Sequence, residues 1–222
     1  MKEQGLLALR GPRHRRFENF LPGPNAALVD TLQRGLEDEA WYFLAGPPGS
    51  GRSHLVHAVL NDKHRAGQAV TFVSLDIAAQ RELLHHAAGD WVLLDDVDAL
   101  AGDADQEMAL FNALNRWRTE RTGVLMTGAG RDRFDLPDLR SRLGQATRLT
   151  LKPLDDDGLR RLVEQLAREY EVVLGRGAAD YLLSRTARNA ASIARLIERL
   201  AQRALSERRT LSIPLIRDHP AR

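Results

Sequence analysis

The fold of this chain is decided by the stretch Gly46-Pro47-Pro48-Gly49-Ser50-Gly51-Arg52-Ser53. It matches the P-loop pattern G-x-x-x-x-G-[KR]-[ST]. In that pattern a turn presents successive backbone N–H groups, and the following helix points its positive end at the same place. Such a turn binds a polyphosphate, and the hydroxyl of Ser53 is placed to bind Mg²⁺. The sequence therefore predicts a nucleotide site made of residues 46–53 and His54, against the alternative of a chance Gly-Pro turn.

One residue departs from the usual P-loop. Arg52 stands where the pattern most often has lysine. Arginine keeps the positive charge, but its planar guanidinium is larger and differently hydrated than an ammonium group. We therefore expect the site to hold phosphate, and we leave open at this point whether it supports cleavage of a γ-phosphate.

Strand-like and helix-like segments alternate on both sides of the P-loop. The strands, apolar on both faces as in a covered parallel sheet, are expected at residues 41–45, 69–75, 91–94, 123–127 and 147–151. Helices are expected at residues 25–38, 52–65, 78–86, 104–121 and 139–143. After Lys152-Pro153 the pattern is helical at 155–170, 176–186 and 190–206, before a β-prone piece at 210–213. We expect a basic tail at 1–16, an α/β domain with a five-stranded parallel sheet flanked by helices at 17–152, and a small all-helical domain at 153–222.

Composition narrows the class of protein. The chain has no cysteine, which excludes disulfides, thiolate metal sites and a cysteine nucleophile. No apolar run is long enough to span a membrane, and no signal-peptide pattern opens the chain, so we expect a bacterial cytoplasmic protein with no membrane partner. The formal net charge of +2 does not by itself predict nucleic-acid binding. Basic residues crowd the tail, either as a solvated end or as an interaction arm, at Lys2, Arg10, Arg13, Arg15 and Arg16.

Acidic and polar residues end the expected strands. Asp95 and Asp96 close a strand as a Walker B pair does, so Asp95 would hold Mg²⁺ and Asp96 would orient a water molecule. The alternative is a pair of solvent-facing acids, and Asp98 is expected at the surface. Thr127 ends the next strand, where it would sense the γ-phosphate or simply reflect the β-propensity of threonine.

Two arginines lie on the short helix expected at 139–143. Arg142 is a candidate arginine finger, a guanidinium that reaches the nucleotide of a neighbouring subunit. From spacing alone, an arginine at position 140 or 142 would more often be a surface helix charge. His54 and His57 share a helix face, but no acid completes a zinc site with them, so no metal is expected beyond the Mg²⁺ that accompanies nucleotide.

Four stretches together resemble a known family. Residues 51–58, 93–102, 125–128 and 136–143 are similar to motifs of the AAA+ module of the DnaA family, and most similar to its Hda branch, in which arginine replaces the P-loop lysine. The resemblance runs from Phe17 to about Pro214. It implies an AAA+ fold with a helical lid, bound ADP or ATP, and a role for Arg142 as the finger that acts on ATP held by DnaA.

The same resemblance implies a second partner, the DNA-loaded sliding clamp. Members of the Hda branch carry an N-terminal clamp-binding peptide of the form Q-L-x-L-P-L. Here Gln4, Leu7 and Leu9 fit that form, while Gly5 and Ala8 depart from it. An extended peptide of this kind places alternate apolar side chains in a pocket of its partner.

The family also places a sensor II arginine on the last long lid helix. Here Ala191 aligns with it, with Arg188 three residues before and Arg195 four residues after, on roughly the same helix face. Either arginine is a possible substitute. No helix-turn-helix follows the lid pattern, so we expect no sequence-specific DNA binding.

The leading hypothesis is a negative regulator of chromosomal replication initiation that stimulates hydrolysis of DnaA-bound ATP and has weak or no ATPase of its own. Its rivals are a self-contained AAA+ ATPase, such as a helicase loader or remodeller, and an adaptor in which nucleotide is purely structural. The oligomeric state, including a homo-oligomer, is open.

Overall fold

A computed structural model describes residues 15–207 and 209–218. The predicted clamp-binding residues Gln4, Leu7 and Leu9 lie outside these ranges. Within the described ranges, no helix is both long enough and apolar enough to cross a membrane.

The centre of the molecule is a five-stranded sheet in the order β2-β3-β4-β1-β5. Its strands are β1 (Trp41–Ala45), β2 (Val70–Ser74), β3 (Trp91–Asp95), β4 (Gly123–Gly128) and β5 (Thr147–Thr150). Every neighbouring pair is parallel, and β1, β3 and β4 are buried along their whole length. These pairings confirm the predicted parallel α/β sheet. Strands covered on both faces need near-continuous apolar runs, and β1, β3 and β4 supply them.

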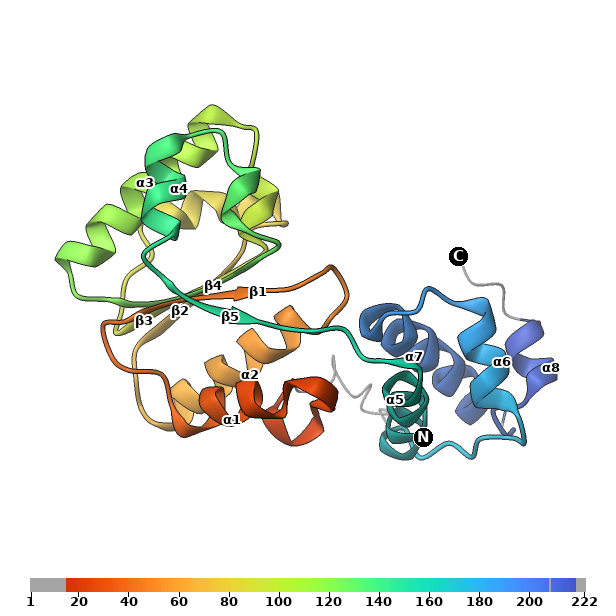
Figure 1. Cartoon of the computed structure of the whole chain (residues 1–222). Coiled ribbons are helices and arrows are strands. Elements are labelled where there is room, and N and C mark those ends of the chain that lie inside the picture. Colours follow the sequence, from red (N-terminus) through yellow and green to blue (C-terminus); the bar gives the residue numbers. More distant parts are fainter. Residues whose placement is uncertain (1–14, 208, 219–222) are drawn as a thin grey trace, which may run out of the picture.

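Helices cover both faces of the sheet (Figure 1). One face carries α1 (Ala26–Arg34) and α2 (Arg52–Arg65), whose apolar residues form one core cluster. The other face carries α3 (Ala104–Thr119), α4 (Pro137–Leu143) and the 3₁₀ segment η3 (Ala78–His85), over a second cluster. The first helix ends at Arg34 and not at residue 38, because Gly35 takes a φ of +100° that a helix does not allow.

The lid consists of α5 (Asp156–Glu169), α6 (Ala178–Arg185), α7 (Ala190–Ser206) and α8 (Ile213–Arg217) around its own core cluster. Asp155 and Asn189 cap α5 and α7 by accepting from Gly158 N and Ser192 N. The β-prone piece at 210–213 forms only one bridge, between Leu174 and Leu211, and α8 was not predicted. Pro214 is the second residue of α8, in the first helical turn, where its missing N–H costs no helical hydrogen bond.

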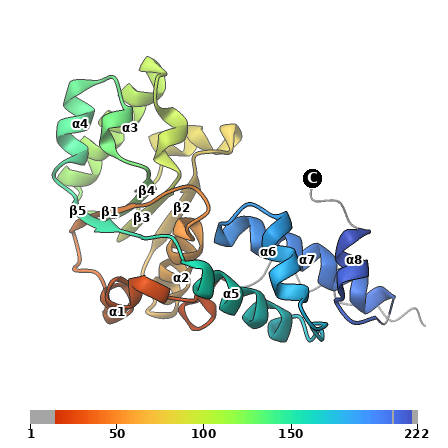
Figure 2. The ribbon, with the colours of Figure 1, turned by 45° about the vertical axis from the view of Figure 1, so that its right-hand side comes forward.

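The lid stands beside the sheet, joined through the chain that leaves β5 (Figures 1 and 2). Asn25 fixes this connection, since its side-chain amide accepts from Lys152 N at 2.7 Å and donates to Lys152 O at 2.9 Å. Asn25 is buried, so both bonds are shielded from water. The P-loop, at the end of β1, is thereby held opposite the lid helix α7.

Candidate functional site

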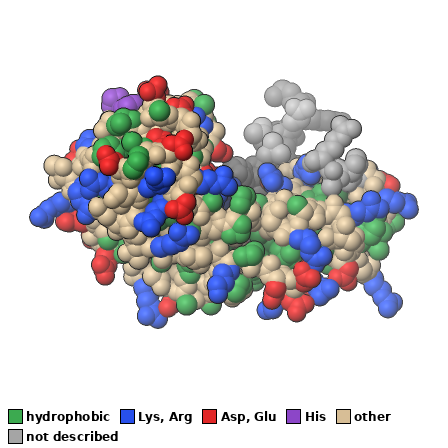
Figure 3. Space-filling view, turned by 45° about the horizontal axis from the view of Figure 1, so that its top comes forward, with side chains coloured by type: hydrophobic (Ala, Val, Ile, Leu, Met, Phe, Trp, Pro, Cys, Tyr) green, Lys and Arg blue, Asp and Glu red, His purple; other side chains and the backbone are tan. Residues whose placement is uncertain are grey.

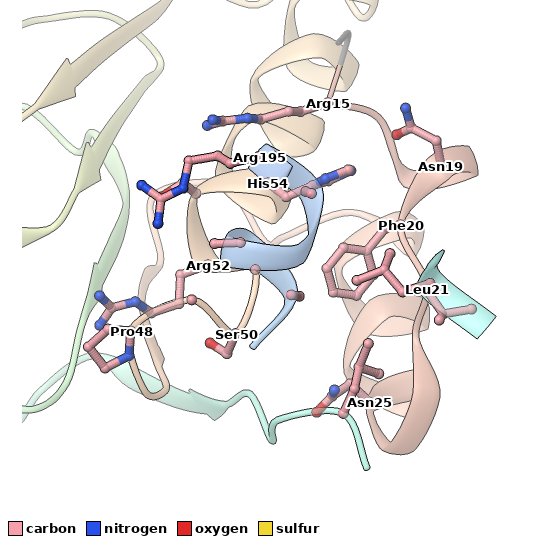
Figure 4. A pocket seen from close by; sticks show the side chains of 18 of the residues that line it. Arg15, Asn19, Phe20, Leu21, Asn25, Pro48, Ser50, Arg52, His54 and Arg195 are labelled. Atoms are coloured by element: carbon pink, nitrogen blue, oxygen red, sulfur yellow. The ribbon is translucent and has the colours of Figure 1, made fainter. Parts of the chain in front are cut away.

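A cleft of about 380 Å³ separates the P-loop from the lid (Figure 4). Four parts of the chain line it: the segment before α1, the P-loop with the start of α2, helices α5 and α7 with the residues that flank α5, and Asp96 just after β3. The first and third parts add apolar side chains at one end of the cleft, including Phe20, Leu21, Leu154, Leu162 and Tyr170. A cleft with a polar loop at one end and apolar walls at the other fits a nucleotide, with phosphates at the loop and a base between the apolar residues.

The P-loop backbone is the part of the cleft that receives phosphate. Gly49 and Gly51 have φ values of +78° and +107°, in the left-handed region that favours glycine. A β-carbon on Gly49 would collide with the Asn189 side chain, and one on Gly51 would lie 2.8 Å from the Phe20 ring. The buried Ser50 Oγ has no hydrogen-bond partner among the described residues. The loop therefore offers backbone N–H groups with little side-chain cover, and a serine hydroxyl that can still form a hydrogen bond. Both features fit a bound polyphosphate.

Arg52 does not extend freely into this cradle. Its Nη2 donates to Asp96 Oδ1 at 2.6 Å, its Nη1 donates to Gly46 O at 3.0 Å, and Nη1 lies 3.6 Å from Asp98 Oδ2. The side chain is only 8% exposed. The expectation that Asp98 lies at the surface is wrong, because Asp98 faces Arg52 and also accepts from Ala129 N. Two partly buried carboxylates thus hold the buried guanidinium beside the end of β3.

The predicted Walker B residues lie together. Asp95 is buried at the end of β3, and Thr127 on the neighbouring β4 donates its hydroxyl to Asp95 Oδ1 at 2.6 Å. The same hydroxyl accepts from Asp96 N at 2.9 Å. Asp96 has a φ of +57°, and burial together with the Asp95 charge raises the pKa of its carboxyl, although the Arg52 charge opposes that rise. Thr127 therefore orients the Asp95 carboxylate and fixes the backbone of Asp96, a role that its strand position alone did not reveal, while γ-phosphate sensing stays a prediction.

The residues present fit Mg²⁺ only as part of a nucleotide complex. Among the described residues, no group of three or more His, Cys, Asp or Glu side chains could hold a metal. Ser53 and Asp95 would supply two oxygen ligands at most, so phosphate oxygens and water would complete the octahedron that Mg²⁺ prefers.

The lid reaches the P-loop directly. Ala191 N donates to Gly49 O at 3.2 Å, so the start of α7 sits on the loop. Of the two arginines left open by the sequence, Arg195 lines the cleft, whereas Arg188 forms an ion pair with Asp156 and does not line it. Figure 4 shows Arg195 with Arg15 and Arg52 around the same space. The cleft thus has a lid arginine one helical turn beyond the expected position.

Sequence reasoning missed the apolar end of the cleft. His54, at the start of α2, contacts the segment before α1: its ring centroid lies 5.2 Å from that of Phe20, and its Nε2 lies 2.9 Å from Arg16 O. The aromatic entry at residues 17–20 was the available signal. Its distance from the P-loop in sequence concealed that Phe20 packs beside Gly51.

Arg142 lies elsewhere. It is on α4, partly exposed, with its Nη1 3.4 Å from Gln145 Oε1. It does not line the cleft, and α4 and α2 lie on opposite faces of the sheet (Figure 1). The structure therefore does not bring Arg142 to the chain's own P-loop.

Two family models match this architecture in succession. One, the ATPase family associated with various cellular activities (AAA), matches residues 42–151, and the other, the lid domain of Hda, matches residues 155–219. This chain is a Hda-like, DnaA-related AAA+ protein. The AAA model describes an ATPase family, so the cleft beside the P-loop belongs to a nucleotide-binding domain.

Solved structures share the fold. DnaA bound to AMPPCP and single-stranded DNA is 22% identical, with a TM-score of 0.69 over 87% of this chain and 65% of that chain. Domain III of DnaA from Thermotoga maritima is 16% identical, with a TM-score of 0.74 over 92% and 95%. The Thermotoga maritima RuvB Holliday junction branch migration motor is 17% identical, with a TM-score of 0.60 over 91% and 66%. This chain spans about two thirds of the first DnaA structure's length.

Proposed function

We propose that this protein is a negative regulator of replication initiation that promotes hydrolysis of ATP held by DnaA. Its own cleft binds ADP or ATP with Mg²⁺, and the bound nucleotide contacts both the P-loop and the lid. Residues Gln4, Leu7 and Leu9 bind the DNA-loaded sliding clamp, and Arg142 reaches the γ-phosphate in the DnaA site. The hydrolysis therefore takes place in the partner, with a positive charge supplied from this chain.

The position of Arg142 carries the proposal. A guanidinium that is partly exposed, and that lies across the sheet from its own P-loop, is available to another molecule's nucleotide. The ATP of a second protein is a ligand that such a geometry suits, because an arginine finger can be supplied in trans.

The chain's own cleft favours holding nucleotide over cleaving it. Arg52 donates to Asp96 Oδ1 at 2.6 Å, so this oxygen is already engaged and is less available to orient a water molecule. Ala191 has no charged group, so among the described lid residues that line the cleft Arg195 supplies the guanidinium. These features support weak or absent intrinsic hydrolysis.

The test is hydrolysis of DnaA-bound ATP with and without clamp-loaded DNA, using the full chain and a version lacking residues 1–10. We expect stimulation by the full chain only when loaded clamp is present, and a large loss without the tail. No stimulation under any condition would contradict the proposed function. Equal stimulation by the shortened chain would contradict only the proposed binding of the clamp by Gln4, Leu7 and Leu9.

The self-contained ATPase remains a second candidate because the Asp95–Thr127 hydrogen bond keeps Walker B acids oriented at the end of β3. Steady-state turnover by the purified protein separates the two: robust hydrolysis without DnaA, clamp or DNA would favour this candidate.

Arg52→Lys should raise that basal turnover. A lysine has a single compact ammonium group, so it cannot keep three contacts with Gly46, Asp96 and Asp98 at once, and Asp96 is released. We expect an increase of about tenfold, the worth of one hydrogen bond to a charged group. Phosphate release by the Arg52→Lys protein measures it, with Arg52→Ala as a control that should bind nucleotide poorly. Unchanged turnover with intact binding would show that Arg52 does not restrain Asp96.

A further inference from the structure

A segment of residues 15–25, which we call the strap, runs between the P-loop helix α2 and the lid. At its start, Arg15 O accepts from Asn61 Nδ2 at 2.9 Å, so the backbone of Arg15 is fixed to α2. Further along, Asn19 O accepts from Gln165 Nε2 of the lid helix α5 at 3.0 Å. The strap is therefore held on both sides of the nucleotide cleft. The contact that places Arg15 is made by its backbone, so a change of its side chain does not remove it.

The exposed side chain of Arg15 lines the cleft without a partner of opposite charge. Its polar neighbour among the described residues is His57, whose Nδ1 lies 3.4 Å from Arg15 Nη1. That ring nitrogen also lies 2.8 Å from Ser53 O, which can only accept, so the nitrogen carries the proton that it donates there. Burial lowers the pKa of His57 and the Arg15 charge adds to this effect, although the bond to Ser53 opposes it. The ring is therefore neutral and offers the Arg15 guanidinium no acceptor.

The cation of the P-loop itself is already neutralised by acids. Arg52 Nη2 lies 2.6 Å from Asp96 Oδ1, and its Nη1 lies 3.6 Å from Asp98 Oδ2. Arg15 and Arg195 also line the cleft, and among the described residues neither forms an ion pair with a carboxylate. Figure 4 shows these two side chains running in the same direction, with their guanidinium ends on the side where Arg52 lies. The positive charge still available to a bound polyphosphate therefore comes from outside the P-loop.

We propose that Arg15 is a phosphate ligand of the bound nucleotide and reaches the cleft from the strap. This inference rests on the proposed binding of ADP or ATP and deepens it, but it does not depend on DnaA or on the clamp. A guanidinium stays charged and matches phosphate oxygens in a bidentate geometry. Among the described residues that line the cleft, the acids are Asp96, which Arg52 engages, and Glu198. Arg15 and Arg195 therefore outweigh Glu198, and the surplus positive charge suits the anion of ADP or ATP.

The test is the affinity for ADP, measured by titration calorimetry with the full chain and Mg²⁺. The variant is Arg15→Ala, and its matched control is Arg16→Ala, which removes the neighbouring exposed guanidinium that does not line the cleft. Basic and acidic side chains are mixed over both lobes of the face seen in Figure 3, so the loss of one surface charge should matter little by itself. We expect Arg15→Ala to bind ADP about tenfold more weakly, the worth of one hydrogen bond to a charged group, and Arg16→Ala to bind it as the wild type does.

Inorganic pyrophosphate, used as a competitor of ADP, identifies the group that Arg15 contacts. It carries phosphates without ribose or base, so Arg15→Ala should weaken its binding by the same factor as that of ADP. A loss for ADP alone would place Arg15 on the ribose or base and overturn the phosphate assignment. Unchanged ADP affinity in Arg15→Ala, or equal losses in Arg15→Ala and Arg16→Ala, would overturn the contact while leaving the proposed function intact. If the wild type does not bind ADP, the proposed nucleotide site fails and this inference fails with it.

Discussion

Arg142→Ala should abolish stimulation of DnaA-bound ATP hydrolysis and leave ADP binding by this protein unchanged. In related phosphoryl-transfer systems an arginine finger contributes roughly 10³ to 10⁵ in rate, so the loss should be about a thousandfold or complete within detection. Binding should survive because Arg142 does not line the cleft and packs on the opposite face of the sheet from α2. Single-turnover hydrolysis of labelled ATP on DnaA, with loaded clamp present, measures the first effect.

Arg133→Ala is the matched control for this prediction. Arg133 is an exposed guanidinium on η5 (Arg131–Arg133), the short segment just before α4, so the substitution removes the same charge from the same region. It should retain most of the stimulation. If Arg142→Ala stimulates DnaA as well as Arg133→Ala does, then Arg142 is a surface charge and the mechanism is wrong.

The fold was predictable from the sequence because its signals are local. The P-loop turn, the apolar strand before it and the helix from Arg52 to Arg65 occupy consecutive residues, and the observed bounds of β1 and α2 match those predicted. Helix α7 also has its predicted bounds, with Asn189 as a cap that the sequence displays one residue before it. Prediction was weakest for α8, since five residues are too few to establish a helical period.

The site was only partly predictable, because its charges interact across long sequence separations. Arg52 and Asp96 are 44 positions apart, and no local pattern says that they form an ion pair rather than facing a ligand. The choice between Arg188 and Arg195 depended on Asp156, which occupies one of them and leaves the other in the cleft. Both outcomes are decided by tertiary packing, which brings α5, α7 and the ends of β3 and β4 together.

Glu107 is a functional candidate that the sequence did not single out at all. It is an acid within the amphipathic helix α3, where a surface position is the ordinary expectation. In the structure it is 1% exposed, and it accepts backbone N–H groups from Gly102, Asp135 and Leu136 at 2.7 to 3.0 Å. The last two precede α4, so this buried carboxylate fixes the start of the helix that carries Arg142.

Glu107→Gln should therefore destabilise the protein by about 3 kcal/mol at neutral pH, since an amide cannot satisfy three backbone donors and leaves some of them buried and unpaired. Urea unfolding measures this, and Asp105→Asn, an exposed acid on the same helix, should change the midpoint little. Equal stability of the Glu107→Gln and wild-type proteins would contradict the assigned contacts.

The pH dependence gives this prediction a second, independent check. Burial raises the pKa of Glu107, but the hydrogen bonds from Leu136, Gly102 and Asp135 and the Arg140 charge outweigh that effect, so its folded pKa lies below the ordinary value. A depressed pKa means that the stabilisation is complete above the unfolded pKa of about 4 and is lost as the pH falls through the folded pKa. The wild-type and Glu107→Gln unfolding curves should therefore converge only in acid.

Because the lost contacts hold the start of α4, Glu107→Gln should also lower stimulation of DnaA more than it lowers ADP affinity. Equal losses of both would mean that Glu107 supports the fold in general and not the placement of Arg142.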